Sequence, residues 1–132
     1  MNSYNSLVLA YLGDAVYEVI IRTYLINHGI CKVNDLQKEA IKYVSAKKQA
    51  SFLESMYTSN FLTDSEDEVI KRARNHKGTR HPKNTDIITY KKSTGFEALI
   101  GYHYLNNNHK RINEIINYIV KEDVSCMFTE EM

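Results

Sequence analysis

Residues 7–17 read Leu-Val-Leu-Ala-Tyr-Leu-Gly-Asp-Ala-Val-Tyr, and Asp14 is the only charged residue among them. Apolar residues recur in this stretch at intervals of three and four, which is the spacing of one face of an α-helix. The spacing continues through Leu25, and Gly29 then supplies a stop signal. The pattern predicts one long helix, or two abutting helices, over about residues 4–28.

The rest of the chain shows the same helical spacing and no convincing strand alternation. Residues 75–86 contain a glycine and the only proline, so they predict a loop. The tail after Asp123 is expected to be loosely ordered. Five more helices are predicted: one capped by Asn34 or Asp35, one that restarts at Ser45 and ends near residues 58–60, a short one opened by Ser65, one over about 87–105 and one over about 110–122. These elements predict one all-α domain, a helical bundle, over residues 1–132.

The totals fit an ordinary globular domain. The chain has 132 residues, of which 43% are hydrophobic and 25% are charged, which is enough for a single core. We expect no signal peptide, because the N-terminus lacks a basic region followed by an apolar region. We expect no membrane-spanning segment, because charged residues interrupt every helix-like segment. Cys31 and Cys126 are far apart and form no Cys-x-x-Cys motif, so a reducing, cytoplasmic location is expected.

Positive charge is concentrated in one segment. The whole chain has a net charge of +1, but residues 71–92 carry eight Lys or Arg against one acid, Asp86. Such a segment in a near-neutral protein predicts a polyanionic partner. The alternative is a solvated basic loop without a partner. The basic residues that we expect to contact a nucleic acid are Arg72, Arg74, Lys77, Arg80, Lys83, Lys91 and Lys92.

Two carboxylates stand alone in apolar helices. Residues 95–105 read Gly-Phe-Glu-Ala-Leu-Ile-Gly-Tyr-His-Tyr-Leu, in which Glu97 is the only formal charge, as Asp14 is in the first stretch. A carboxylate is seldom buried without a partner or a metal. Gly13 and Gly101 lie beside these acids, and glycine inside a helix often permits close approach. We expect the two helices to cross tightly and to bring both acids to one place.

Each acid has a simpler interpretation. Asp14 could instead cap a helix that begins at Ala15, and Glu97 could instead pair with Lys91 or Lys92. The two acids taken together, beside a basic segment, favour a common site.

Two oxygen donors at one place suit Mg²⁺, which keeps several waters and binds one or two carboxylates together with a substrate phosphate. Glu18 lies four residues after Asp14 and therefore on the same helix face. It could contribute to the metal site from outside. The favoured interpretation is a salt bridge from Glu18 to Arg22, which also lies four residues away.

These stretches also carry a family resemblance. The segment Leu12-Gly13-Asp14-Ala15-Val16 resembles the first signature helix of the ribonuclease III family, and Phe96-Glu97-Ala98-Leu99-Ile100-Gly101 resembles the second. The larger members carry further acids seven and four residues before the first motif's Asp and three residues before the second motif's Glu. This chain has Leu7, Ala10 and Thr94 at those positions. With these departures the chain resembles the Mini-ribonuclease III subfamily.

The resemblance implies a ribonuclease III-like endonuclease domain without a separate double-stranded-RNA-binding domain. It implies Asp14 and Glu97 as the catalytic acids and Mg²⁺ ligands, a homodimer with one site for each strand, and cleavage of double-stranded RNA. The implied substrate is the 23S ribosomal RNA precursor, with a ribosomal protein on that precursor as a further partner. The implied reaction is phosphodiester hydrolysis, in which the metal polarises a phosphate oxygen and activates water. Fewer acids than in the larger enzymes imply weaker metal binding.

Three points stay open. The first helix carries more apolar side chains than one small core needs, among them Leu7, Leu12 and Val16. This excess is consistent with a dimer but does not exclude a monomer. A non-catalytic RNA-binding or ribosome-assembly module on the same fold would explain the missing acids. A helical protein-interaction domain would make the basic segment incidental. His76 and His81 are interpreted as loop residues, because no third ligand has matching spacing.

Overall fold

The computed structural model describes residues 4–76 and 83–128, with side chains described as far as residue 121. This part of the chain is helical and contains no strand, so the predicted all-α fold is confirmed. The helices are α1 (Ser6–Asn27), α2 (Val33–Val44), α3 (Ala46–Thr58), α4 (Asp64–Arg74), α5 (Ile87–Leu105) and α6 (His109–Phe128). None of the described helices is both long enough and apolar enough to cross a bilayer.

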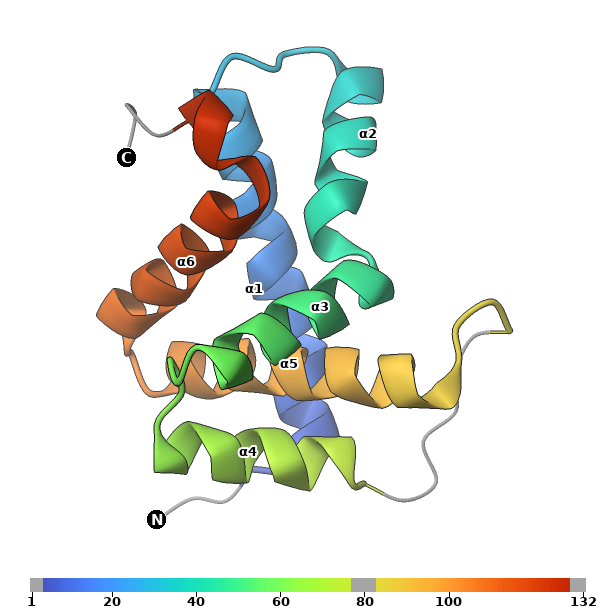
Figure 1. The fold of residues 1–132 in the computed structure, drawn as a ribbon, viewed down its shortest axis with the longest axis vertical. Coiled ribbons are helices and arrows are strands. Elements are labelled where there is room, and N and C mark those ends of the chain that lie inside the picture. Colours follow the sequence, from blue (N-terminus) through green and yellow to red (C-terminus); the bar gives the residue numbers. More distant parts are fainter. Residues whose placement is uncertain (1–3, 77–82, 129–132) are drawn as a thin grey trace.

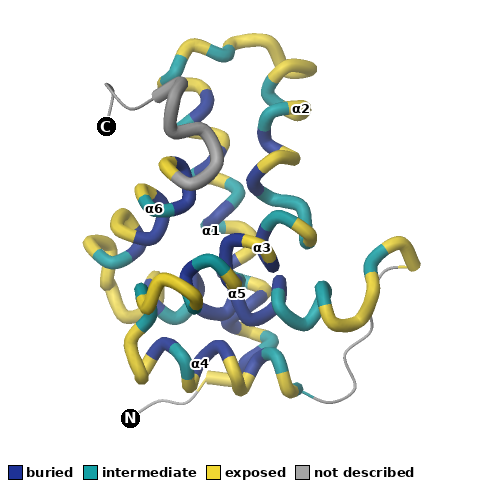
Figure 2. Tube along the Cα trace, viewed as in Figure 1, coloured by how far each residue is buried: buried dark blue, intermediate teal, exposed yellow. Residues whose placement is uncertain are grey.

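Helix α5 is the centre of the packing. It crosses in front of α1 in Figure 1, with α3 on one side of it and α4 on the other. Figure 2 shows that much of α5 is buried, whereas α2 and α4 each keep one exposed face. The largest buried side chains of the core include Tyr17, Tyr43 and Phe96. The rings of Tyr17 and Phe96 pack edge to face, with their centroids 4.9 Å apart. The Tyr17 hydroxyl donates a hydrogen bond of 2.9 Å to the Tyr43 carbonyl oxygen.

Side-chain caps fix several helix starts. The Asn5 side chain accepts from the Leu7 amide, Ser45 accepts from the Lys48 amide, and Asp86 accepts from the Thr89 amide. Gly29 follows α1 with a φ of 97°, a left-handed conformation that suits glycine and matches the predicted stop signal.

Three boundary predictions were wrong. Thr63, not Ser65, caps α4, because Thr63 and Glu66 form a reciprocal capping box. Helix α2 begins at Val33 without a side-chain cap, so neither Asn34 nor Asp35 has that role. Helix α6 continues to Phe128 instead of ending near residue 122.

A buried ion-pair cluster joins α4, α5 and α6. Glu66 is 2% exposed and accepts from His103 Nε2 at 2.6 Å and from Arg111 Nε at 2.7 Å. The Asn108 amide bonds to His103 Nδ1 at 3.1 Å, which leaves Nε2 as the ring nitrogen that donates to Glu66. Burial alone would raise the pKa of Glu66, but the hydrogen bonds from Arg111 and His103 hold it well below its usual range. The cluster therefore contains an ionised carboxylate with several donors, which is the condition under which a buried charge is tolerated.

Candidate active site

Helices α1 and α5 touch backbone to backbone at two glycines. A Cβ atom added at Gly13 would overlap the Glu97 carbonyl group and lie 2.8 Å from the Gly101 amide nitrogen. A Cβ atom at Gly101 would in turn overlap the Leu9 carbonyl group and lie 3.1 Å from the Gly13 nitrogen. No side chain fits at either position, so the predicted tight crossing is confirmed.

The crossing places the two isolated acids together. Asp14 lies inside α1, so the alternative in which it caps a helix beginning at Ala15 is wrong. Its side chain is within hydrogen-bonding reach of Glu97. Asp14 is exposed and Glu97 is half-buried, so the argument from burial applies to Glu97 and less to Asp14. The crossing therefore brings two carboxyl groups together, one exposed and one half-buried.

The pair is electrostatically unfavourable when both groups are ionised. Burial, followed by the negative charge of Asp14 and a hydrogen bond with it, raises the pKa of Glu97 from 4.5 to about 8. A neighbouring lysine does not relieve this repulsion, because Lys92 pairs with Glu54 and not with Glu97. Two carboxylates in this state favour a bound cation or a shared proton.

A buried amide completes the surroundings of Glu97. Gln49 on α3 is 1% exposed, donates its Nε2 to the Val44 carbonyl oxygen at 3.3 Å, and also hydrogen-bonds Glu97, which lowers the pKa of that carboxyl group. Sequence analysis did not identify Gln49. The available signal was one amide in an otherwise apolar row of α3 that includes Phe52, Leu53 and Met56.

The positions of the acids that this chain lacks are otherwise occupied. Ala10 is buried, and Thr94 is buried with its hydroxyl donated to the Tyr90 carbonyl oxygen at 3.0 Å. Glu18 pairs with Arg22 at 3.6 Å, as favoured from their spacing. Among the side chains that the structure describes, no three or more His, Cys, Asp or Glu residues form a group able to hold a metal.

The residues present nevertheless fit one magnesium ion. Asp14 and Glu97 supply two hard oxygen donors whose charges repel each other, and a divalent cation between them would remove that repulsion. Mg²⁺ commonly uses one or two carboxylates and fills its remaining positions with water and phosphate oxygens. The site therefore has the donor chemistry for Mg²⁺ with few protein ligands.

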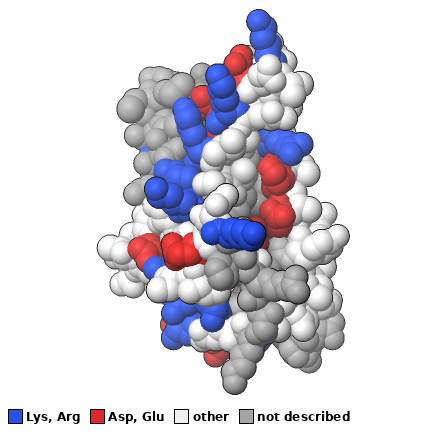
Figure 3. Space-filling model, turned by 90° about the vertical axis from the view of Figure 1, so that its right-hand side faces the viewer, with Lys and Arg blue, Asp and Glu red and all other residues white. Residues whose placement is uncertain are grey.

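The expected basic residues are spread over separate elements. Arg72 is exposed and Arg74 half-buried at the end of α4; Lys83 is exposed before α5, while Lys91 and Lys92 are half-buried within it. Lys77 and Arg80 lie outside the described residues. On the face that Figure 3 shows, Lys and Arg side chains form several groups with acidic side chains between them. Among the members that the structure describes, Lys92 forms an ion pair with Glu54.

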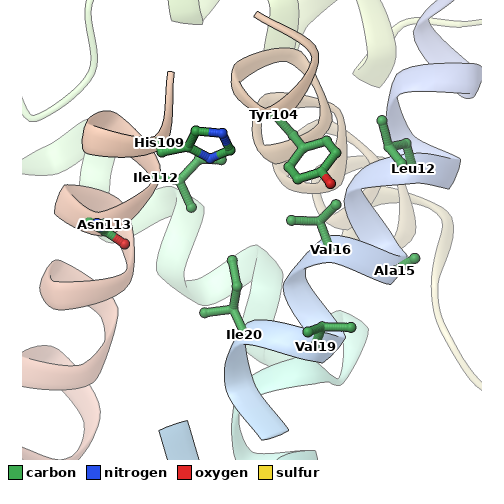
Figure 4. Close-up of a pocket in the computed structure, with 9 residues that line it drawn as sticks. All are labelled: Leu12, Ala15, Val16, Val19, Ile20, Tyr104, His109, Ile112 and Asn113. Atoms are coloured by element: carbon green, nitrogen blue, oxygen red, sulfur yellow. The ribbon is translucent and has the colours of Figure 1, made fainter. Parts of the chain in front are cut away.

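Helix α1 carries an exposed apolar face. Val8, Tyr11 and Val19 are 52%, 84% and 63% exposed and lie on one side of the helix. Beside them is a groove of about 480 Å³ between α1, α5 and α6 (Figure 4), lined mostly by apolar residues. The lining residues are Leu12, Ala15, Val16, Val19, Ile20, Tyr104, His109, Ile112 and Asn113. Leu7, Leu12 and Val16, the apolar residues in excess of one small core, are half-buried, and Leu12 and Val16 line this groove.

The chain is similar to known proteins over most of its length. The family described as Ribonuclease III domain matches residues 7–108. Mini-ribonuclease 3 of Enterococcus faecalis is 46% identical over 89% of each chain, and Mini-ribonuclease 3 of Brevibacillus brevis is 49% identical over 87% of this chain and 84% of its own length. An X-ray crystal structure of a Fusobacterium nucleatum protein superposes with a TM-score of 0.82 at 33% identity and covers 93% of this chain and 97% of its own. The chain therefore belongs to the ribonuclease III family of endoribonucleases, within its Mini-ribonuclease 3 group.

Proposed function

We propose that this endoribonuclease cleaves double-stranded RNA with Mg²⁺ and that Asp14 and Glu97 are its catalytic acids. The observation that supports this proposal is the meeting of the two carboxyl groups where α1 and α5 cross. The chain's family gives the reaction class, and the two signature segments lie on the two crossing helices.

Asp14 and Glu97 would each offer a carboxylate oxygen to the cation. When bound there, Mg²⁺ supplies Lewis-acid polarisation of a phosphate and a more acidic water for hydrolysis. Glu97 has to give up its proton to act as a ligand, because its pKa is raised to about 8 without the ion. Gly13 and Gly101 keep the two helix backbones in contact, so the separation of the acids is fixed by rigid elements.

The RNA contact would come from the basic residues around α4 and the start of α5. A duplex is bound chiefly through its phosphates, and A-form RNA is recognised by its shape and its 2′-hydroxyl groups. Arg72, Lys83 and Lys91 are at least partly exposed and can reach phosphates without breaking an ion pair found in the structure. Lys77 and Arg80 remain predictions of the same kind.

A second copy of the chain would cover the apolar face of α1. Tyr11, 84% exposed, lies one turn from Asp14 along that helix, so a partner on this face would lie close to the catalytic acids. A homodimer would then present two sites to one duplex, one for each strand. Such a large exposed aromatic side chain beside Val8 and Val19 is typical of an interaction surface.

The proposed substrate is the 23S ribosomal RNA precursor in the cytoplasm, with a ribosomal protein on that precursor as a further partner. This part of the proposal depends on the resemblance to the Mini-ribonuclease III subfamily. It predicts that the enzyme cuts a precursor helix at few positions. Phosphate contacts alone give little preference among duplexes, so this selectivity would require contacts other than those to phosphates.

A non-catalytic RNA-binding module is the second candidate. The small number of acids at the crossing favours it, since Ala10 and Thr94 are buried and offer no carboxylate. It predicts RNA binding that is independent of Asp14 and no Mg²⁺-dependent strand scission.

The test is cleavage of a ribosomal RNA precursor and of a plain duplex by wild type, Asp14→Asn and Glu97→Gln, with Mg²⁺ or EDTA. We expect scission by wild type with Mg²⁺ only, and loss of at least about a thousandfold in rate for both variants with RNA affinity retained. Equal Mg²⁺-dependent cutting by Asp14→Asn would remove that residue from the catalytic role. Binding without any cutting by wild type would favour the non-catalytic module.

A further inference from the structure

Gln49 is a polar side chain at a buried position of α3 whose neighbours in the same row are apolar. It is 1% exposed on α3, next to buried Ala50 and in the row that carries Phe52 and Leu53. Helix α3 packs against α5 in the same region (Figure 1). A buried amide of this kind is unfavourable unless its donors and acceptors are paired, so its position requires a reason.

The hydrogen bonds of Gln49 are unequal. Its Nε2 group, which has two hydrogens, donates to the Val44 carbonyl oxygen at 3.3 Å and to the Glu97 carboxyl group. Its Oε1 atom is buried and has no partner among the described residues. The amide is therefore oriented by what its nitrogen reaches, and the unpaired oxygen is the unfavourable consequence.

A neutral donor suits this position better than a charged one. A buried lysine or arginine beside Glu97 would form an ion pair with it and would compete with a cation for the carboxylate. An amide fixes the carboxylate's orientation and leaves its charge available. Val44, the other acceptor, belongs to the backbone at the end of α2, so Gln49 links the carboxyl group to a rigid part of the fold.

We propose that Gln49 is a positioning residue, which holds the Glu97 carboxylate in the orientation that binds the catalytic cation. The inference rests on the proposed function, because it assumes that Glu97 is a metal ligand. Groups that orient metal ligands commonly change metal affinity or activity by about ten- to a hundredfold when they are removed. Gln49 acts through Glu97 and is not expected to touch the RNA.

The test compares Gln49→Met and Gln49→Leu with a matched control. Both replacements put an apolar side chain of similar size in place of the amide, so at least one is expected to fold. The control is Ser55→Ala. Ser55 lies on α3, as Gln49 does, and its hydroxyl forms a 2.8 Å hydrogen bond with that of Tyr118 on α6, away from Glu97. Mn²⁺ binding is measured by calorimetry without RNA, and kcat and KM for a duplex are measured at saturating Mg²⁺.

For Gln49→Met or Gln49→Leu we expect about tenfold weaker Mn²⁺ binding and about tenfold lower kcat, with KM for the RNA unchanged. Ser55→Ala should lower the melting temperature and leave Mn²⁺ binding and kcat as in wild type. Wild-type Mn²⁺ affinity in a folded Gln49 variant would overturn the inference, as would an equal loss of affinity in Ser55→Ala.

Glu97→Gln in the same experiment separates this inference from the proposed function. If Glu97→Gln loses Mn²⁺ binding and the Gln49 variants do not, only the role of Gln49 is refuted. If Glu97→Gln retains both Mn²⁺ binding and cleavage, the proposed site itself is refuted, and the role of Gln49 with it.

Discussion

The substitution Glu97→Gln is predicted to stabilise the metal-free protein while it abolishes catalysis. Above its ordinary pKa of 4.5, Glu97 ionises in the unfolded chain, but in the folded chain it keeps its proton up to a pH of about 8. The folded state thus binds more protons than the unfolded state between these values, so stability falls as the pH rises from 4.5 to about 8. Glutamine cannot ionise and removes this dependence.

The size of the effect follows from the two pKa values. At about 1.4 kcal/mol for each tenfold change in acid constant, a pKa of about 8 in place of 4.5 corresponds to at most about 5 kcal/mol above pH 8. Burial is the largest cause of the raised pKa of Glu97. A glutamine amide at the same place also loses its contact with water on folding, so the substitution recovers only part of this free energy. Glutamine removes the repulsion from Asp14, so we expect about 2 kcal/mol of added stability, or roughly 8 °C in melting temperature.

The assay is thermal unfolding followed by circular dichroism at pH 5, 7 and 9, in EDTA and in Mg²⁺. In EDTA, the melting temperature of the variant should exceed that of wild type at pH 9, and the two should be nearly equal at pH 5. Mg²⁺ should raise the melting temperature of wild type alone. Glu18→Gln is the control, because Glu18 is partly exposed and pairs with the exposed Arg22, so its loss should change stability by less than about 1 kcal/mol. A Glu97→Gln protein less stable than wild type at pH 9 would refute the electrostatic reasoning.

Three further predictions concern other parts of the molecule. Gly13→Ala should lower stability by at least about 3 kcal/mol in urea unfolding, because the added Cβ overlaps backbone that cannot move aside. Glu66→Gln should lower the melting temperature at pH 7 by roughly 10 °C. The gap should narrow as the pH falls below 4.5, because the unfolded wild-type chain then takes up a proton at Glu66 while the folded protein keeps this carboxylate ionised to a much lower pH. Replacing Arg72, Arg74 and Lys91 by Gln together should weaken duplex binding and reduce the salt slope by up to about 3, measured by fluorescence anisotropy.

Each of these three predictions has a clear contrary outcome. Alanine is the better helix former by about 1 kcal/mol, so an unchanged or stabilised Gly13→Ala protein would mean that the helices do not touch there. A Glu66→Gln protein with the same pH dependence as wild type would show that the carboxylate is not ionised in the folded state. Lys38→Gln on α2 is the control for the basic residues, and an equal loss of salt slope in that variant would place the RNA elsewhere.

Much of the fold was predictable because hydrophobic spacing reports helices directly. The bounds of α5, Ile87–Leu105, agree with the predicted range of about 87–105, and the stop at Gly29 has the expected left-handed backbone. The helix starts were less predictable. Thr63 and Ser65 both precede an acidic turn, and only the geometry of the Glu66 side chain decides between them.

The pairing of Asp14 with Glu97 was predictable because two unusual features coincided in each stretch, 7–17 and 95–105: a single charged residue and a glycine inside a helix. The contact of Gln49 with Glu97 was not, because its place in the apolar row of α3 indicates burial but not which residue of α5 it reaches. The most exposed residues of α1 were not predictable for a related reason. Spacing identifies rows of apolar side chains, but the packing of α5 against α1 decides how far each row is exposed, and Tyr11 is more exposed than Leu12.

The most direct measurement is a crystal structure of the protein with Mn²⁺, using anomalous scattering to locate the ion. We predict a peak at the crossing of α1 and α5, with one carboxylate oxygen each of Asp14 and Glu97 about 2.1–2.3 Å from it and water in the remaining positions. A fully occupied Mn²⁺ site elsewhere in the protein, or an ion bound by only one of the two acids, would contradict the assignment of this pair as the metal site.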